Sequence, residues 1–191
     1  MGGGGDVVGA LATAELIRLY DGGDPVLGGL TWERRPFDPV PGPRTAAEIT
    51  GAEELAPGIL LAGPDTRLRD RDLFFAESRM AEFLGQRTLL IDINDGPAPV
   101  ADGLAQAMAA LKCDLLVLVD VGGDVVAQGD EPGLRSPLAD AVMLAAGCRG
   151  GASRSCSESS GSGATPSSRR ARCWRGWPRS RLPAGCAARA G

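Results

Sequence analysis

The sequence predicts an α/β protein with an open, mostly parallel sheet and helices on both faces. Short apolar runs typical of strands alternate several times with segments of helical period, which is the pattern of a βαβ chain. The run at residues 115–121 is almost continuously apolar, as expected for a central parallel strand buried on both faces. The chain is too short for an α/β barrel, which needs about 250 residues.

The first part of the chain predicts three helical segments and two strands. Apolar residues at helical spacing from Val7 to Ile17 indicate the first helix, which the breaker at residues 21–25 ends. The other expected elements are a strand at 26–33, a proline-rich loop at 36–44, a short helix at 45–49, a brief strand at 59–62 and a helix at 73–84.

The second part predicts a strand at 88–93, an amphipathic helix at 104–111 and the buried strand at 115–121. Ser136 and Pro137 are a good N-cap and N1 pair, so they are expected to open the last helix. The residues expected to share the apolar face of that helix are Leu138, Ala141, Val142 and Ala145.

The composition changes sharply at Gly147. Residues 147–191 carry nine Arg, one acidic residue and four of the five Cys, whereas residues 1–146 carry 23 acidic and 11 basic residues. If the codons are read one base earlier, residues 147–178 can become an apolar, β-branched run followed by the helix start Thr-Pro-Gly-Glu. We therefore predict an α/β domain at 1–146, and at 147–191 a basic low-complexity tail that is a frameshift product and mostly disordered.

Charge and composition exclude several classes of function. The acidic body at 1–146 repels phosphate backbones, so nucleic acid is not an expected partner. The chain has no His, which removes Ser-His-Asp triads and imidazole metal sites. No signal-peptide pattern or membrane-length apolar run occurs, so we expect a cytoplasmic protein without membrane contact. The sequence leaves the oligomeric state open.

A glycine run leads directly into the first helix. A loop of this kind offers free N–H groups and a positive dipole end to an anion, so Gly3, Gly4, Gly5 and Asp6 are candidate ligand-binding residues. The alternative, weighed equally, is a tight turn with Asp6 as the N-cap. The match to the dinucleotide fingerprint is poor, because no strand precedes Gly2 and no acid stands at the usual spacing.

The string Gly-Gly-Asp-Val-Val occurs at 4–8 and again at 122–126, after the best strand. Ligands of open α/β sheets bind at the carboxyl ends of strands, so we expect the two loops to share one crevice. Asp6, Asp120 and Asp124, together with Asp92 at the end of the strand at 88–93, are then candidates for binding Mg²⁺ or a sugar hydroxyl, with Gly122 and Gly123 beside them. Each Asp taken alone is more commonly an Asx turn or a helix cap.

The loop before the last helix carries two further candidates. Arg135 and the N–H groups at Ser136 could bind a phosphate or carboxylate at the start of that helix. Alternatively, Arg135 only pairs with Asp130 or Asp140. The same choice between anion recognition and surface pairing applies to four residues around the strand at 26–33: Trp32, Arg34, Arg35 and Arg44.

Five strings together resemble the bacterial and archaeal family of domain of unknown function 1152. They are GGGGDVVGAL at 2–11, TWER at 31–34, IDI at 91–93, VDVGGD at 119–124 and GDEPGLRSPL at 129–138. The resemblance covers nearly all of residues 2–146 and implies a Rossmann-like fold, but it supplies no reaction. The chain departs from the family in lacking a strand before Gly2 and in the sequence after Ala146, so we expect reduced stability.

Two functional hypotheses follow. The first is an enzyme that binds a nucleotide, or another phosphorylated or carboxylated metabolite, at the glycine-rich strand ends and uses Asp and Mg²⁺. The second is a non-catalytic ligand-binding or regulatory module with the same crevice. A non-functional truncated gene product is the remaining alternative. The expected partner is a small molecule, with Mg²⁺ or a nucleotide as candidate cofactors.

Overall fold

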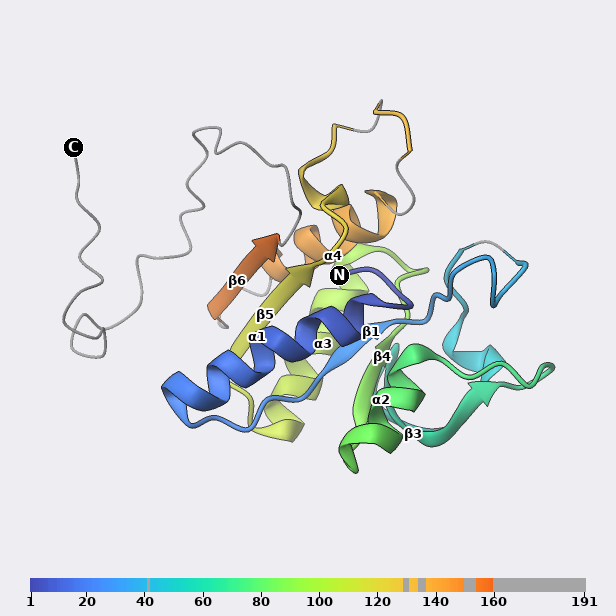
Figure 1. The fold of residues 1–191 in the computed structure, drawn as a ribbon, viewed down its shortest axis with the longest axis horizontal. Helices are drawn as coiled ribbons and strands as arrows, with labels where there is room; N and C mark the ends of the chain where they lie inside the picture. The colour runs from blue at the N-terminus through green and yellow to red at the C-terminus, as the bar shows by residue number, and fades with distance from the viewer. Residues whose placement is uncertain (41, 129–130, 134–136, 150–153, 160–191) are drawn as a thin grey trace.

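The computed structural model describes residues 1–40, 42–128, 131–133 and 137–149, and the backbone of 154–159 (Figure 1). The helices in this part of the chain are α1 (Asp6–Asp21), η1 (Ala46–Glu48), α2 (Ala76–Leu84), α3 (Pro97–Leu111), η2 (Asp124–Val126) and α4 (Pro137–Arg149). The strands are β1 (Gly28–Leu30), β2 (Ile49–Ala56), β3 (Ile59–Leu68), β4 (Thr88–Ile91), β5 (Leu115–Asp120) and β6 (Arg154–Ser159).

The strands form a mixed four-stranded sheet and a separate parallel pair. The larger sheet has the order β1-β4-β3-β2, and β5 pairs with β6. β1 runs parallel to β4, but β3 runs antiparallel to both β4 and β2, so the prediction of a mostly parallel sheet is wrong for this sheet. The cause is local: only Pro57 and Gly58 connect β2 to β3, and so short a connection can join only antiparallel strands.

Helices cover both faces of the larger sheet, as the sequence predicts. Ile59 and Ile91 are paired in register and pack in one hydrophobic cluster with residues of α3 and α4. Their neighbours Leu60 and Leu90 point to the opposite face, where they pack around Phe75 just before α2. α1 and α2 share a further cluster on that side. The alternation along β3 and β4 thus separates an α3/α4 layer from an α1/α2 layer.

β2 is the main element that the sequence analysis missed. The expected short helix at 45–49 is only the turn η1, and its Thr45–Glu48 capping box passes directly into β2. β2 lies at the edge of the sheet, and both Glu53 and Glu54 are exposed on it. A half-solvated edge strand with two consecutive acids lacks the simple alternation that predicts a strand.

α4 and β6 also differ from the expectations. α4 buries Ala139, Met143 and Ala146, whereas Leu138, expected on the apolar face, is 69% exposed. Because the helix is rich in Ala and other apolar residues, its sequence does not single out one face. α4 continues to Arg149 and β6 pairs with β5, so residues 147–149 and 154–159 take part in regular structure within a tail that the sequence predicts to be mostly disordered. The rest of the tail lies outside the described residues.

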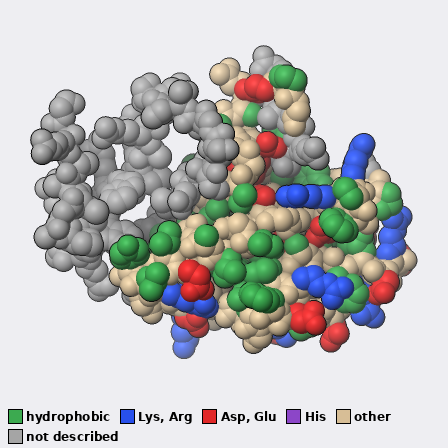
Figure 2. Space-filling model, in the orientation of Figure 1, with side chains coloured by type: hydrophobic (Ala, Val, Ile, Leu, Met, Phe, Trp, Pro, Cys, Tyr) green, Lys and Arg blue, Asp and Glu red, His purple; other side chains and the backbone are tan. Residues whose placement is uncertain are grey.

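The described helices include none with the length and apolarity required to cross a membrane. Hydrophobic side chains are nevertheless exposed over α1 on the face seen in Figure 2. Two residues near the end of α1, Leu19 and Tyr20, are 78% and 79% exposed.

Candidate functional site

The glycine loop packs against the chain that follows β1. A Cβ atom added to Gly3 would lie 1.8 Å from the carbonyl oxygen of Trp32, so no larger residue fits there without a shift of the backbone. Gly4 has a φ of +68°, a conformation that favours glycine. The tight-turn interpretation of the loop is therefore sufficient to explain Gly3 and Gly4.

Gly5 is the N-cap of α1, and no side chain caps the helix there. The first N–H groups of an α-helix have no partner within the helix, and the helix dipole makes this end positive. The guanidinium group of Arg34 lies over the same turn, because a Cβ atom on Gly5 would be 2.7 Å from its Nη2. An exposed Arg thus adds a second positive element to the start of α1.

Asp6 stabilises the loop rather than the helix start. Its carboxylate accepts a hydrogen bond from the backbone N–H of Gly2 at 2.8 Å and lies 3.7 Å from the amino group of Met1. The side chain is mostly buried, at 18% exposure. The alternative in which Asp6 is the N-cap is therefore wrong in that detail, since Gly5 is the N-cap and the Asp6 carboxylate binds back to the N–H of Gly2.

Asp120 forms an Asx turn at the end of β5. One carboxylate oxygen accepts from the N–H of Gly122 at 2.9 Å, and the other accepts from the N–H of Val125 at 3.1 Å. The side chain is 2% exposed. These two contacts agree with the alternative given for each Asp in the sequence, in which an Asp at a strand end forms an Asx turn.

The two Gly-Gly-Asp loops lie at the same edge of the structure. A Cβ atom added to Gly9, in α1, would lie 2.3 Å from the side chain of Val121, so the first turns of α1 contact the loop after β5. Gly123 has a φ of +91° and opens the turn η2, whose first residue is Asp124. Gly122 is exposed, and Asp124 is half-buried. Arg135 and Ser136 lie outside the described residues.

Asp140, in the first turn of α4, is an acidic residue of this edge that the sequence analysis did not select. It is 1% exposed, and its Oδ1 has no hydrogen-bond partner among the described residues. Burial raises the pKa of its carboxyl from the usual 3.8 to about 7, and the negative charge of Asp120 adds to the shift. Asp6 and Asp124 raise it further. The only available signal in the sequence was its place in the first turn of an apolar helix.

The acidic edge, which consists of Asp6, Asp120, Asp124 and Asp140, does not by itself form a metal site. In the described part of the chain, no group of three or more Asp, Glu, Cys or His side chains has the geometry to hold a metal ion. The carboxylates of Asp6 and Asp120 are instead engaged by backbone N–H groups.

The residues around β1 have structural roles that their types alone did not reveal. Glu33 is 6% exposed and accepts a hydrogen bond from the N–H of Ala76, the first residue of α2, at 2.6 Å. Burial raises the pKa of its carboxyl, and the bond from Ala76 opposes that shift. Thr31 donates its hydroxyl to the carbonyl oxygen of Arg44 at 2.5 Å. The TWER string thus fixes α2 and the following loop.

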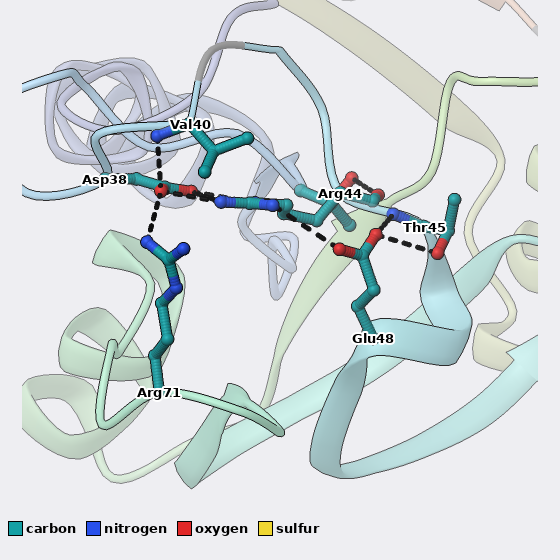
Figure 3. Close-up of polar contacts among 7 residues, drawn as sticks. Asp38, Val40, Arg44, Thr45, Glu48 and Arg71 are labelled. Atoms are coloured by element: carbon teal, nitrogen blue, oxygen red, sulfur yellow. Dashed lines mark hydrogen bonds and ion pairs between the residues drawn. The ribbon is translucent and has the colours of Figure 1, made fainter.

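Arg44 is a structural cation and not an anion site. Its guanidinium donates to Asp38 through Nε at 2.8 Å and through Nη2 at 2.6 Å (Figure 3). Asp38 is 1% exposed, and the Arg44 side chain is 11% exposed. Glu48 lies 3.4 Å from the other side of the guanidinium, so the group is already neutralised by two carboxylates.

The profile of the family described as "Protein of unknown function (DUF1152)" matches residues 1–164. Neither a curated protein nor a solved structure matches the chain. The match spans the glycine loop, all four described α-helices and the acidic edge at the end of β5. The chain therefore belongs to the family of domain of unknown function 1152.

Proposed function

We propose that this protein binds an anionic small molecule, either a nucleotide or another phosphorylated or carboxylated metabolite, at the start of α1. The anionic group lies on the N–H groups that begin α1 ahead of Val8, whose own N–H donates to the carbonyl oxygen of Gly5, and against the guanidinium of Arg34. The rest of the ligand extends toward the loop that contains Gly122 and Asp124. This site keeps the glycine loop of the sequence analysis and adds Arg34 to it.

The position of Arg34 is the observation that carries the proposal. An uncapped helix start and an exposed guanidinium over Gly5 place two positive elements on one turn. Arg binds carboxylates and phosphates through two parallel N–H groups, and a helix N-terminus offers backbone donors to the same group. In the described residues Arg34 has no ion pair within 4.0 Å, although its charge acts on the buried carboxyl of Glu33 and opposes the rise that burial causes in the pKa of that group.

The acidic residues nearby set the character of the rest of the ligand. Asp120 and Asp124 make the edge beside the site negative, and their charges add to the rise that burial causes in the pKa of the Asp140 carboxyl. A second anionic group would be repelled there, whereas a sugar hydroxyl or an amine can donate hydrogen bonds to carboxylates. A ligand with one anionic end and a hydroxyl-rich or basic remainder therefore fits best.

Calorimetry with ATP, NAD⁺, inorganic pyrophosphate and citrate tests the proposal on the full chain. Pyrophosphate and citrate, which have several anionic groups and no sugar or basic part, should bind more weakly than NAD⁺. We expect the Arg34→Ala variant to weaken binding roughly 10- to 100-fold, because a charge-assisted hydrogen bond contributes about 1.5–3 kcal/mol. Arg35→Ala is the matched control, since Arg35 is exposed beside Arg34 but is not among the atoms nearest to Gly3, Gly4 or Gly5. Equal affinities of the two variants, or binding of none of the four compounds at millimolar concentration, would contradict the proposal.

The same experiment separates the two functional hypotheses. An enzyme converts a bound ligand to product over time, which phosphate release or chromatography detects. A ligand-binding or regulatory module returns the ligand unchanged while showing the same loss of affinity in Arg34→Ala.

A further inference from the structure

α1 is apolar on two opposite faces. Its inner face contributes Val7 and Ala14 to the hydrophobic cluster that α1 shares with α2. Its outer face carries a stripe of exposed apolar residues at helical spacing, which we call the outer stripe: Val8, Ala12, Leu16, Leu19 and Tyr20. A surface helix normally has one apolar face and a polar face opposite to it. The outer face of α1 therefore has the composition of a helix face that packs against a partner.

No other described element covers the outer stripe. Figure 1 shows α1 in front of β5 and α3, and Figure 2 shows hydrophobic side chains over α1 on the same side of the molecule. Leu16, in the middle of the stripe, is 50% exposed. The stripe offers on the order of 400 Å² of apolar surface, and contiguous patches of this size commonly mark an interaction surface.

The charges at the margin of the outer stripe are complementary to those of a second α1 that runs in the opposite direction. Glu15 and Arg18 lie one turn apart beside the stripe, and their side chains form an ion pair at 2.7 Å. Along the helix the negative charge comes first and the positive charge second. An antiparallel copy presents them in the reverse order, so each Glu15 lies across from the Arg18 of the other copy. In a parallel pair, like charges would lie across from each other and repel.

The sizes of the side chains match in the same antiparallel arrangement. When the pair is centred on Leu16, this residue packs against its own copy on the two-fold axis, and Ala12 lies across from Tyr20. The small side chain of Ala12 leaves room for the tyrosine ring, as helix packing of large into small positions requires. The start of α1, with Gly5 and Arg34, extends beyond the end of the second helix. Self-association therefore leaves the proposed anion site uncovered.

We propose that the outer stripe is a self-association surface, on which a second copy of this chain docks through an antiparallel α1–α1 contact. The same surface is used on both copies, so the contact closes as a two-fold dimer and does not continue into a filament. The stripe and its charged margins bury on the order of 1,000 Å² in total, which is at the low end for specific interfaces. The dimer therefore forms at micromolar protein concentrations and dissociates on dilution.

Sedimentation velocity of the full chain over a range of micromolar concentrations tests the proposal. We expect a reversible monomer–dimer equilibrium, and we expect Leu16→Glu to raise its dissociation constant about 10-fold or more, because it places two like charges together on the two-fold axis. Leu138→Glu is the matched control, since Leu138 is an exposed leucine on another helix, α4, and should leave the equilibrium unchanged. Far-UV circular dichroism confirms that both variants keep the parent fold.

A charge exchange tests the antiparallel pairing itself. Glu15→Arg and Arg18→Glu should each weaken the homodimer, because each variant brings like charges together across the contact. An equimolar mixture of the two variants should form a heterodimer as readily as the parent forms its homodimer, since opposite charges then face each other again. Any of three results would overturn the proposal: a parent chain that stays monomeric at all concentrations, equal effects of Leu16→Glu and Leu138→Glu, or a mixture that associates no better than the separate variants.

Discussion

Replacing Asp38 by Ala should destabilise the protein strongly, because it breaks a buried ion pair and leaves one partner behind. Asp38 is 1% exposed and receives two short hydrogen bonds from the guanidinium of Arg44. It also accepts from the N–H of Val40 at 3.0 Å, which closes the loop after β1 (Figure 3). Asp38→Ala therefore leaves a nearly buried guanidinium and a backbone donor without their carboxylate.

The expected loss is about 3–4 kcal/mol in the free energy of unfolding. Removing one partner of a buried pair costs about 3–5 kcal/mol, and the low end applies because Glu48 lies 3.4 Å from Arg44 and keeps part of the neutralisation. A loss of this size should lower the melting temperature by about 10 °C in a chain of this length. Urea unfolding at pH 7, followed by far-UV circular dichroism, measures the free energy directly.

Two further variants check the reasoning. Arg71 also lies 3.7 Å from Asp38 but is 45% exposed, so Arg71→Ala should cost less than about 1 kcal/mol. Adding Arg44→Met to Asp38→Ala should restore part of the stability, because the unpaired charge is removed together with its partner. If Asp38→Ala costs no more than Arg71→Ala, the buried pair does not hold the loop and the account is wrong.

Two other predictions concern the glycine loop and the acidic edge. Gly3→Ala should lower the free energy of unfolding by about 2–3 kcal/mol, because the added Cβ would meet the carbonyl oxygen of Trp32. The control Gly23→Ala, whose Cβ would lie 3.6 Å from Ile17, should cost less than about 0.5 kcal/mol. Equal melting temperatures of the two variants would refute this prediction. The folded-state pKa of Asp140, about 7, exceeds its usual 3.8, so the folded state binds the extra proton and stability should fall as pH rises between these values. Asp140→Asn should flatten the dependence of the free energy of unfolding on pH, and at pH 8 it should be more stable than the parent by about 2 kcal/mol in urea unfolding. An unchanged pH dependence would mean that another group, and not Asp140, titrates in this range.

The sequence was most informative where the local structure depends on residues that are adjacent along the chain. Helical periodicity located α1, and the apolar run located β5 almost to its ends. Pro137 begins α4 as predicted, because proline suits the first turn of a helix. Gly4 and Gly123 adopt positive φ values, so turn geometry explains one glycine in each copy of the repeated string.

The candidate site was predicted only in part. The sequence selected the glycine loop and the strand-end Asp residues, but it did not place Arg34 over Gly5 or Asp140 beside Asp120. It also left the role of Arg44 undecided between a ligand and a structural partner. Each of these outcomes depends on which side chains are buried together, and residue type and spacing do not contain that information.

The sequence by itself determined that the chain is built of alternating strands and helices, and which loops carry glycine and acid. The tertiary structure alone decided the strand directions, the mixed sheet and the separate pairing of β5 with β6. The physical reason is the distance along the chain over which each feature is set. Helix starts and tight turns need only adjacent residues, whereas the contact between Met1 and Val119 joins residues 118 positions apart and forms only when the start of the chain packs against β5.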